Sequence, residues 1–276
     1  MSGALGLGQY VAMGSSFAAG PGLRPRVQGS PLLAGRSQGN YAHLVAARLG
    51  LILDDQTYSG ATIREIAGRA EAPRHPAQVE AVGAGTRLVT VTGGGNDVGY
   101  LPVLTVASMP AWLPVRSRRV AAFTAAGAAD RAFDRLQADL QALCTTIRGR
   151  CDALIVLTDY LTVIPADPAA STPPLPGDTA DWGRDVAARL TATISRVAAE
   201  QGCAFVPLGQ ASRDHHAWSA EPWIRGFHLR VRGGAAYHPT LPGMAAAAGL
   251  IEAAILQRAP NLAPVQPREA SGQQEA

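Results

Sequence analysis

Four residues that lie far apart in the sequence could together carry out acyl transfer. Ser16 follows the apolar run 10–13, and Gly60 and Asn96 each follow a later apolar run, while His238 lies near the end of the chain. A serine nucleophile beside a histidine base, with donors for the oxyanion, forms and hydrolyses acyl-enzymes. We therefore expect Ser16 to be the nucleophile and His238 the base. The backbone N–H groups of Ser16 and Gly60 and the Asn96 amide would be the oxyanion donors.

Each of these residues also has an ordinary structural interpretation. Ser16 could cap a helix after a strand, Gly60 could serve a turn, and Asn96 and His238 could be cap or helix-start residues. Their joint order, with three of them at the ends of expected strands, is what favours a common site.

The elements that must position these residues alternate between strand and helix, which is typical of a parallel sheet covered on both faces. The carboxyl ends of parallel strands meet at one edge, so residues that follow different strands can line one crevice. The sequence predicts an α/β fold with a central parallel sheet of about five strands, at 10–13, 51–53, 86–92, 153–158 and 203–207. Helices are expected over 40–49, 62–69, 116–148 (one bent helix or two), 181–201 and after His238-Pro239, with proline in the first turn.

Three further segments lack helical periodicity. Residues 20–39 are rich in Gly, Pro and Arg and should border the site, and residues 208–237 are expected to be irregular loop. The apolar segment 100–114 is expected to be a loop that either forms an acyl pocket or packs as ordinary cover over the sheet. We expect a single domain over 1–259 and a frayed tail over 260–276.

Composition excludes several functions. The chain has 276 residues, a formal net charge of +3 and 24 basic residues, all of them arginine and scattered, so nucleic acid is not an expected partner. The lack of lysine removes P-loop and Schiff-base chemistry. No apolar run is long enough for an integral membrane segment, and no signal peptide is recognisable. The chain as given is therefore expected to be cytoplasmic, or secreted if it is a trimmed mature form.

No cofactor or metal is expected. Asp214, His215 and His216 offer metal-binding side chains, but adjacent histidines point apart and no His-Glu-x-x-His helix exists. Three cysteines cannot all pair within the chain. Cys144 and Cys151 could bridge a helix end to the next strand, or all three could be small buried side chains.

Four blocks of the sequence resemble those of the SGNH, or GDSL, hydrolase family, closest to its actinobacterial-type esterase and lipase branch. They are Gly14-Ser15-Ser16-Phe17, Ser59-Gly60-Ala61, Gly94-Gly95-Asn96-Asp97 and His238-Pro239. The segment 212–226 resembles the loop before the histidine block in the secreted actinobacterial branch, whose three disulfides this chain lacks. The resemblance implies a flavodoxin-like three-layer α/β/α sandwich and a serine esterase or lipase acting on a small-molecule acyl ester.

The chain departs from that family at two positions. Ser15 stands where the family's first block has aspartate, and Ala235 stands where the acid normally precedes the histidine. The resemblance implies that the Ala235 main-chain carbonyl orients His238, because a carbonyl can accept the Nδ1 proton and fix the tautomer. Asp214 is the alternative acid. The missing carboxylates also leave open a catalytically weak protein that binds an acylated or sugar ligand.

Overall fold

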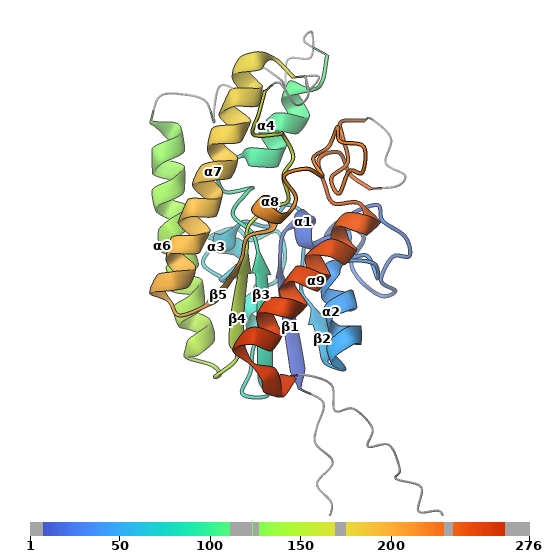
Figure 1. The fold of residues 1–276 in the computed structure, drawn as a ribbon. Coiled ribbons are helices and arrows are strands. Elements are labelled where there is room, and N and C mark those ends of the chain that lie inside the picture. The colour runs from blue at the N-terminus through green and yellow to red at the C-terminus, as the bar shows by residue number, and fades with distance from the viewer. Residues whose placement is uncertain (1–7, 111–122, 124–126, 169–174, 229–233, 263–276) are drawn as a thin grey trace, which may run out of the picture.

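The computed structural model describes residues 8–110, 123, 127–168, 175–228 and 234–262 (Figure 1). Five parallel strands form one sheet in the order β2-β1-β3-β4-β5, which confirms the predicted fold class. The strands are β1 (Gln9–Gly14), β2 (Ile52–Asp55), β3 (Thr86–Thr92), β4 (Leu154–Thr158) and β5 (Ala204–Val206).

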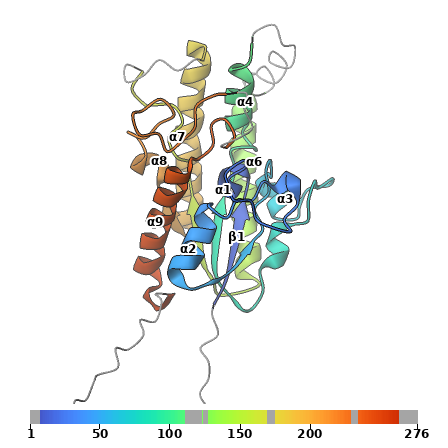
Figure 2. The same ribbon diagram turned by 90° about the vertical axis from the view of Figure 1, so that its right-hand side faces the viewer.

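Helices cover both faces of this sheet. On one face α2 packs against α9, and on the other α6 packs against α3 and α7, as Figure 2 shows for α2 and α9 on one side of β1 and α3 on the other. The helices are α1 (Ser16–Ala19), α2 (Tyr41–Leu49), α3 (Ile63–Ile66), α4 (Tyr100–Ala107), α6 (Ala128–Arg148), α7 (Gly177–Glu200), α8 (Leu208–Ala211) and α9 (Leu241–Arg258). The described ranges also contain the short 3-10 turns η1 (Leu32–Ala34), η2 (Gln78–Ala81) and η3 (Pro260–Leu262).

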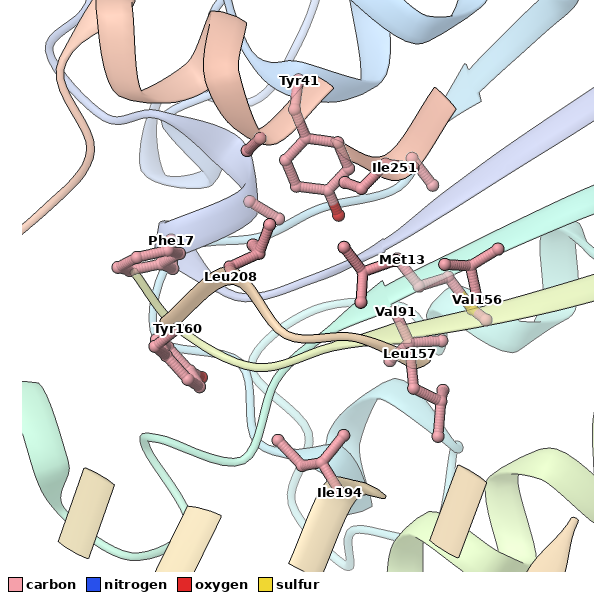
Figure 3. Packing of buried hydrophobic residues seen from close by; sticks show 14 of the residues in the cluster. Met13, Phe17, Tyr41, Val91, Val156, Leu157, Tyr160, Ile194, Leu208 and Ile251 are labelled. Carbon is pink, nitrogen blue, oxygen red and sulfur yellow. The ribbon is translucent and has the colours of Figure 1, made fainter. Parts of the chain in front are cut away.

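The core lies on both sides of the central strands. Figure 3 shows Tyr41 of α2 and Ile251 of α9 on one side of the strands and Ile194 of α7 on the other. β1 is buried along nearly its whole length, which is why its apolar residues form a run rather than an alternating pattern. The buried Tyr10 hydroxyl of β1 is hydrogen-bonded, since it lies 2.8 Å from the hydroxyl of Thr90.

The prediction for residues 100–114 is wrong in part, because Tyr100–Ala107 form helix α4. Six of its eight residues are buried, so the helix is apolar nearly all round and lacks the polar stripe that reveals an amphipathic helix. Residues 111–114 lie outside the described ranges. The prediction that 208–237 is loop throughout is also wrong, since the first four residues form α8.

All three cysteines are free, so Cys144 and Cys151 are not bridged. Cys144 and Cys203 are buried with their sulfurs 3.8 Å apart, and the Cys151 thiol faces the Ile147 carbonyl. Of the expected tail, residues 260–262 form η3 and the rest lies outside the described part of the chain. Within that part no helix has the length and apolar character that a membrane crossing requires.

Candidate active site

The turn after β1 brings Ser16 to the carboxyl edge of the sheet. A Cβ atom at Gly14 would lie 2.5 Å from the Thr92 carbonyl oxygen, so only glycine lets β1 pass this close to β3. The Ser15 N–H donates to the same carbonyl at 3.0 Å. Ser16 is the first residue of α1 and is half-buried, so its hydroxyl is held at the edge and remains accessible.

A buried side chain that sequence analysis missed holds this turn. The Gly14 N–H donates to Oε1 of Gln78 at 2.8 Å, and Nε2 of Gln78 donates to the Gly14 carbonyl at 3.0 Å. Gln78 is 1% exposed and belongs to a 3-10 turn with no recognisable motif. It satisfies both backbone groups where β1 ends, and a glutamine far along the chain gives no local signal of that role.

His238 lies against Ser16 in a serine–histidine pair. Its Nε2 is 2.7 Å from the Ser16 Oγ, and its Nδ1 is 2.7 Å from the carbonyl oxygen of Ala236. Because a carbonyl only accepts, the proton of a neutral ring is placed on Nδ1, and Nε2 is free to accept the serine proton.

The carbonyl at Nδ1 is therefore Ala236, not the expected Ala235. The Ala235 carbonyl instead accepts the backbone N–H of His238 at 3.4 Å, and Ala235 lines the catalytic cavity. Tyr237 explains the difference: its φ is +58°, a left-handed conformation that reverses the chain between Ala236 and His238.

Several contacts hold Tyr237 in that conformation. Its side chain is buried and its hydroxyl lies 2.6 Å from Oγ of Ser108. Its N–H donates to the Arg225 carbonyl at 2.9 Å, and the Arg225 N–H donates to the His238 carbonyl at 2.9 Å. His238 thus sits in a paired segment, not at a helix start as expected, because α9 begins at Leu241 behind the Thr240 cap.

Burial keeps the His238 ring neutral, which is the form that can act as a base. Packing of the half-buried ring lowers the pKa of His238 below its ordinary value of 6.5, and the hydrogen bond to Ala236 opposes this shift. The neutral form, which can accept the Ser16 proton, is therefore favoured over the imidazolium.

Ser16, Gly60 and His238 line one cavity of about 580 Å³. Gly60 has φ +83°, a conformation that favours glycine. Asn96 is not among the residues that line this cavity. Its Nδ2 donates to the carbonyl of Ala61, the residue after Gly60, at 2.9 Å. The structure thus joins the Asn96 block to the Gly60 turn, and the role of Asn96 toward an oxyanion stays a prediction.

Asp97 strengthens this connection between the two loops. Its carboxylate oxygens accept the N–H of Ile63, the first residue of α3, at 3.0 and 3.2 Å. Burial raises the pKa of Asp97 to about 7, although the Ile63 hydrogen bond favours the charged form.

Arg74 places a cation in the catalytic cavity. Its guanidinium donates to the Gly60 carbonyl and forms an ion pair with Glu65, with Nε 2.7 Å from Oε1 and Nη2 2.6 Å from Oε2. The hydrogen bond from Arg74 lowers the pKa of Glu65 to about 2. Because Glu65 also closes a capping box with Thr62, the Gly60 turn is fastened to the start of α3.

Ser15 occupies a buried position where a carboxylate would have to be paired. It is 2% exposed and hydrogen-bonds the hydroxyl of Tyr160, which also accepts the Gly95 N–H at 2.8 Å. Tyr160 in turn packs edge-on against Phe17 with ring centroids 4.7 Å apart. A small hydroxyl therefore fills this buried position without a charge that would need a partner.

The other candidate acid and the histidines beside it do not meet His238. Asp214 is exposed. Burial lowers the pKa of His216, and the charge of Asp214 partly opposes this shift. His215 stacks on Trp223 with ring centroids 4.0 Å apart and bonds the Glu221 carbonyl. Within the described ranges, no three side chains of His, Cys, Asp or Glu gather in a way that could hold a metal ion.

Replacing Asn96 by alanine should slow ester turnover by about two to three orders of magnitude, the typical cost of one lost oxyanion donor. The loss should appear in kcat, because the amide acts on charge that develops only in the transition state. Asn261→Ala, an exposed asparagine in η3, is the matched control. A rise in KM with kcat unchanged would instead make the amide a substrate contact.

Comparison with known proteins shows the family of the chain. Residues 12–246 match the GDSL-like Lipase/Acylhydrolase family. The chain is 30% identical to Lipase 2 of Streptomyces coelicolor over 241 residues, which is 80% of this chain and 78% of that protein. Among solved structures it resembles phospholipase A1 from Streptomyces albidoflavus (TM-score 0.75, 23% identity) and an extracellular lipase from Streptomyces rimosus (TM-score 0.70, 25% identity). Each match covers 90% of this chain and 99% of the solved chain. At 23% identity, the similarity to the phospholipase is evidence for the fold alone. The chain therefore belongs to the GDSL-like lipase/acylhydrolase family, with Streptomyces lipases among its relatives, and is a carboxylic-ester hydrolase.

Proposed function

We propose that the protein hydrolyses carboxylic esters through an acyl-enzyme on Ser16. His238 Nε2 takes the Ser16 proton while Oγ attacks the ester carbonyl carbon. The tetrahedral oxyanion is stabilised by the N–H groups of Ser16 and Gly60 and by the Asn96 amide. The C–O bond to the alcohol then breaks, and His238 returns the proton to the leaving oxygen.

Deacylation repeats these steps with water. His238 takes a proton from a water molecule as its oxygen attacks the acyl carbon. The bond to Oγ breaks, the proton passes to Ser16, and the carboxylic acid leaves. The serine and histidine are thereby regenerated without any other group changing its charge.

The observation that carries this proposal is the pair of contacts on His238. Ser16 Oγ and the Ala236 carbonyl lie 2.7 Å from the two opposite ring nitrogens. The carbonyl fixes the useful tautomer but supplies no full negative charge, so it stabilises the imidazolium less than a carboxylate would. A short chromogenic ester, p-nitrophenyl butyrate, tests turnover directly.

A second function, binding of an acylated or sugar ligand by a catalytically weak chain, rests on the absent carboxylates. Burst release of p-nitrophenol followed by steady turnover supports the hydrolase. Saturable binding of the ester with no release of p-nitrophenol would favour the binding protein.

Turnover should depend on pH through one acidic limb with a midpoint below 6.5, the ordinary pKa of histidine. Protonated His238 cannot accept the serine proton, so kcat/KM falls as the pH drops through the lowered pKa of the free enzyme. The profile should be measured in the wild type and in Asp97→Asn, because Asp97 has a pKa of about 7. The limb should survive in that variant. A midpoint above 7 in both proteins would contradict a base held by a neutral carbonyl.

Asp214→Asn should change kcat/KM by less than about threefold, because it is the Ala236 carbonyl that lies 2.7 Å from Nδ1 of His238. If Asp214 were the acid, the same substitution should cost on the order of ten thousandfold through the wrong tautomer. Asp178→Asn, an exposed aspartate in the first turn of α7, serves as the control. Circular dichroism confirms that each variant is folded.

A further inference from the structure

Two adjacent leucine side chains are exposed to solvent beside the catalytic cavity. Leu32 is 80% exposed and Leu33 is 77% exposed, more than any other large apolar side chain in the described part of the chain. We call Pro31, Leu32 and Leu33 the leucine tip. Leu33 also lines the cavity that holds Ser16 and His238. Contiguous exposed apolar groups at the edge of a site indicate contact with an apolar partner.

The leucine tip is fastened to the site. The carbonyl of Ala34, directly after the tip, accepts the N–H of Ser59 at 3.1 Å and its hydroxyl at 2.9 Å. Nε of Arg36 donates to the Thr57 carbonyl at 2.8 Å. The tip is therefore held in place by the residue that precedes Gly60, so whatever it touches lies at the mouth of the cavity.

The segment that carries the leucine tip is positively charged. The segment 20–39 contains Arg24, Arg26 and Arg36 and no acidic residue. The Arg26 guanidinium donates to the carbonyl of Ser30, which places it at the start of the tip, and Arg24 is exposed.

The segment that carries the tip also approaches another exposed apolar residue, Leu241 at the start of α9. Leu241 is 45% exposed, and its Cδ2 lies 2.6 Å from where a Cβ of Gly39 would stand. In Figure 1 this segment forms the blue loops beside the upper end of α9.

We propose that the leucine tip docks the protein on the surface of an anionic lipid aggregate and so presents the cavity to esters held there. An apolar tip flanked by arginines matches the acyl layer and the anionic headgroups together. A second protein is a poorer match, because three side chains offer far less than the roughly 800 Å² per partner of a stable interface. The proposal rests on the proposed function, since such docking serves an enzyme that acts on lipid esters.

Vesicle sedimentation tests the docking without catalysis. The full chain carrying Ser16→Ala, which leaves the lipid intact, is compared with the same chain carrying Leu32→Ser as well. Ile52→Ser is the matched control, because Ile52 is 56% exposed and lies at the amino-terminal end of β2, away from the cavity. Leu32 itself does not line the cavity. The vesicles are phosphatidylcholine, with or without phosphatidylglycerol.

We expect the parent to bind phosphatidylglycerol-containing vesicles more tightly than phosphatidylcholine alone, and less tightly at high salt. Leu32→Ser should lower the partition coefficient about tenfold, the scale of withdrawing one leucine from an apolar layer. Ile52→Ser should leave it unchanged. Absence of vesicle binding by the parent, or equal binding by the Leu32→Ser and Ile52→Ser proteins, would overturn the proposal.

A kinetic comparison separates this inference from the proposed function. With Ser16 intact, Leu32→Ser should leave hydrolysis of soluble p-nitrophenyl butyrate unchanged and slow hydrolysis of a p-nitrophenyl ester of a long acyl chain embedded in the vesicles. Equal slowing on both substrates would overturn the docking role. Failure of the wild type to hydrolyse any ester would contradict the proposed function, while the sedimentation experiment would still decide the docking.

Discussion

Ser16→Ala should reduce ester turnover by about a millionfold, the scale seen when the nucleophile of a serine hydrolase is removed. The loss follows because no acyl-enzyme can form, while donors for the oxyanion remain and leave a small residual rate. The fold should be unchanged, because Ser16 is only half-buried and the contact that its hydroxyl loses is the one with His238 at the site. The measurement is kcat/KM on p-nitrophenyl butyrate, with a thermal melt as the check on folding.

The neighbouring serine provides the matched control for that substitution. Ser15 is buried, hydrogen-bonds Tyr160 and does not line the cavity, so Ser15→Ala should keep turnover within about tenfold of the wild type. Turnover of Ser16→Ala within about tenfold of the wild type would refute the nucleophile, whatever Ser15→Ala does.

His238→Ala should cause a loss of the same size, because without the base the Ser16 hydroxyl keeps its proton and attacks poorly. Combining it with Ser16→Ala should add almost nothing, since the two side chains act as one unit. Turnover by the two single variants and the double variant is measured on the same ester.

His216→Ala is the control, because His216 is buried in the loop before the histidine block and has no contact with Ser16. It should keep turnover within a few-fold of the wild type. Losses that multiply in the double variant would mean that Ser16 and His238 act independently, against the proposed dyad.

The sheet could be predicted because local pattern and tertiary position agree there. The β-branched run at 86–92 coincides with β3, and the short apolar runs became the other strands. Helix α2 lies where the helix over 40–49 was predicted, and the Asn40 side chain caps it by accepting the His43 N–H. Helix α4 was missed because burial on nearly every side erases helical periodicity.

The candidate site, like the fold, could be predicted from the sequence only in part. Ser16, Gly60 and His238 follow motifs, and the structure brings them to one cavity. The orienting carbonyl was predicted one residue too early, because a left-handed Tyr237 is rare for a non-glycine residue and its cause lies in contacts to Ser108 and Arg225. Gln78 and Arg74 were missed, since each reaches the site through a loop without periodicity or motif.

Covalent labelling by a fluorophosphonate tests the central claim most directly, because it reports the nucleophile itself rather than the effect of removing a side chain. Intact-mass analysis and peptide mapping should find a single phosphonyl adduct on Ser16, formed at the rate at which ester turnover is lost. An adduct on another residue at that rate, or turnover that persists after Ser16 is fully labelled, would contradict the account.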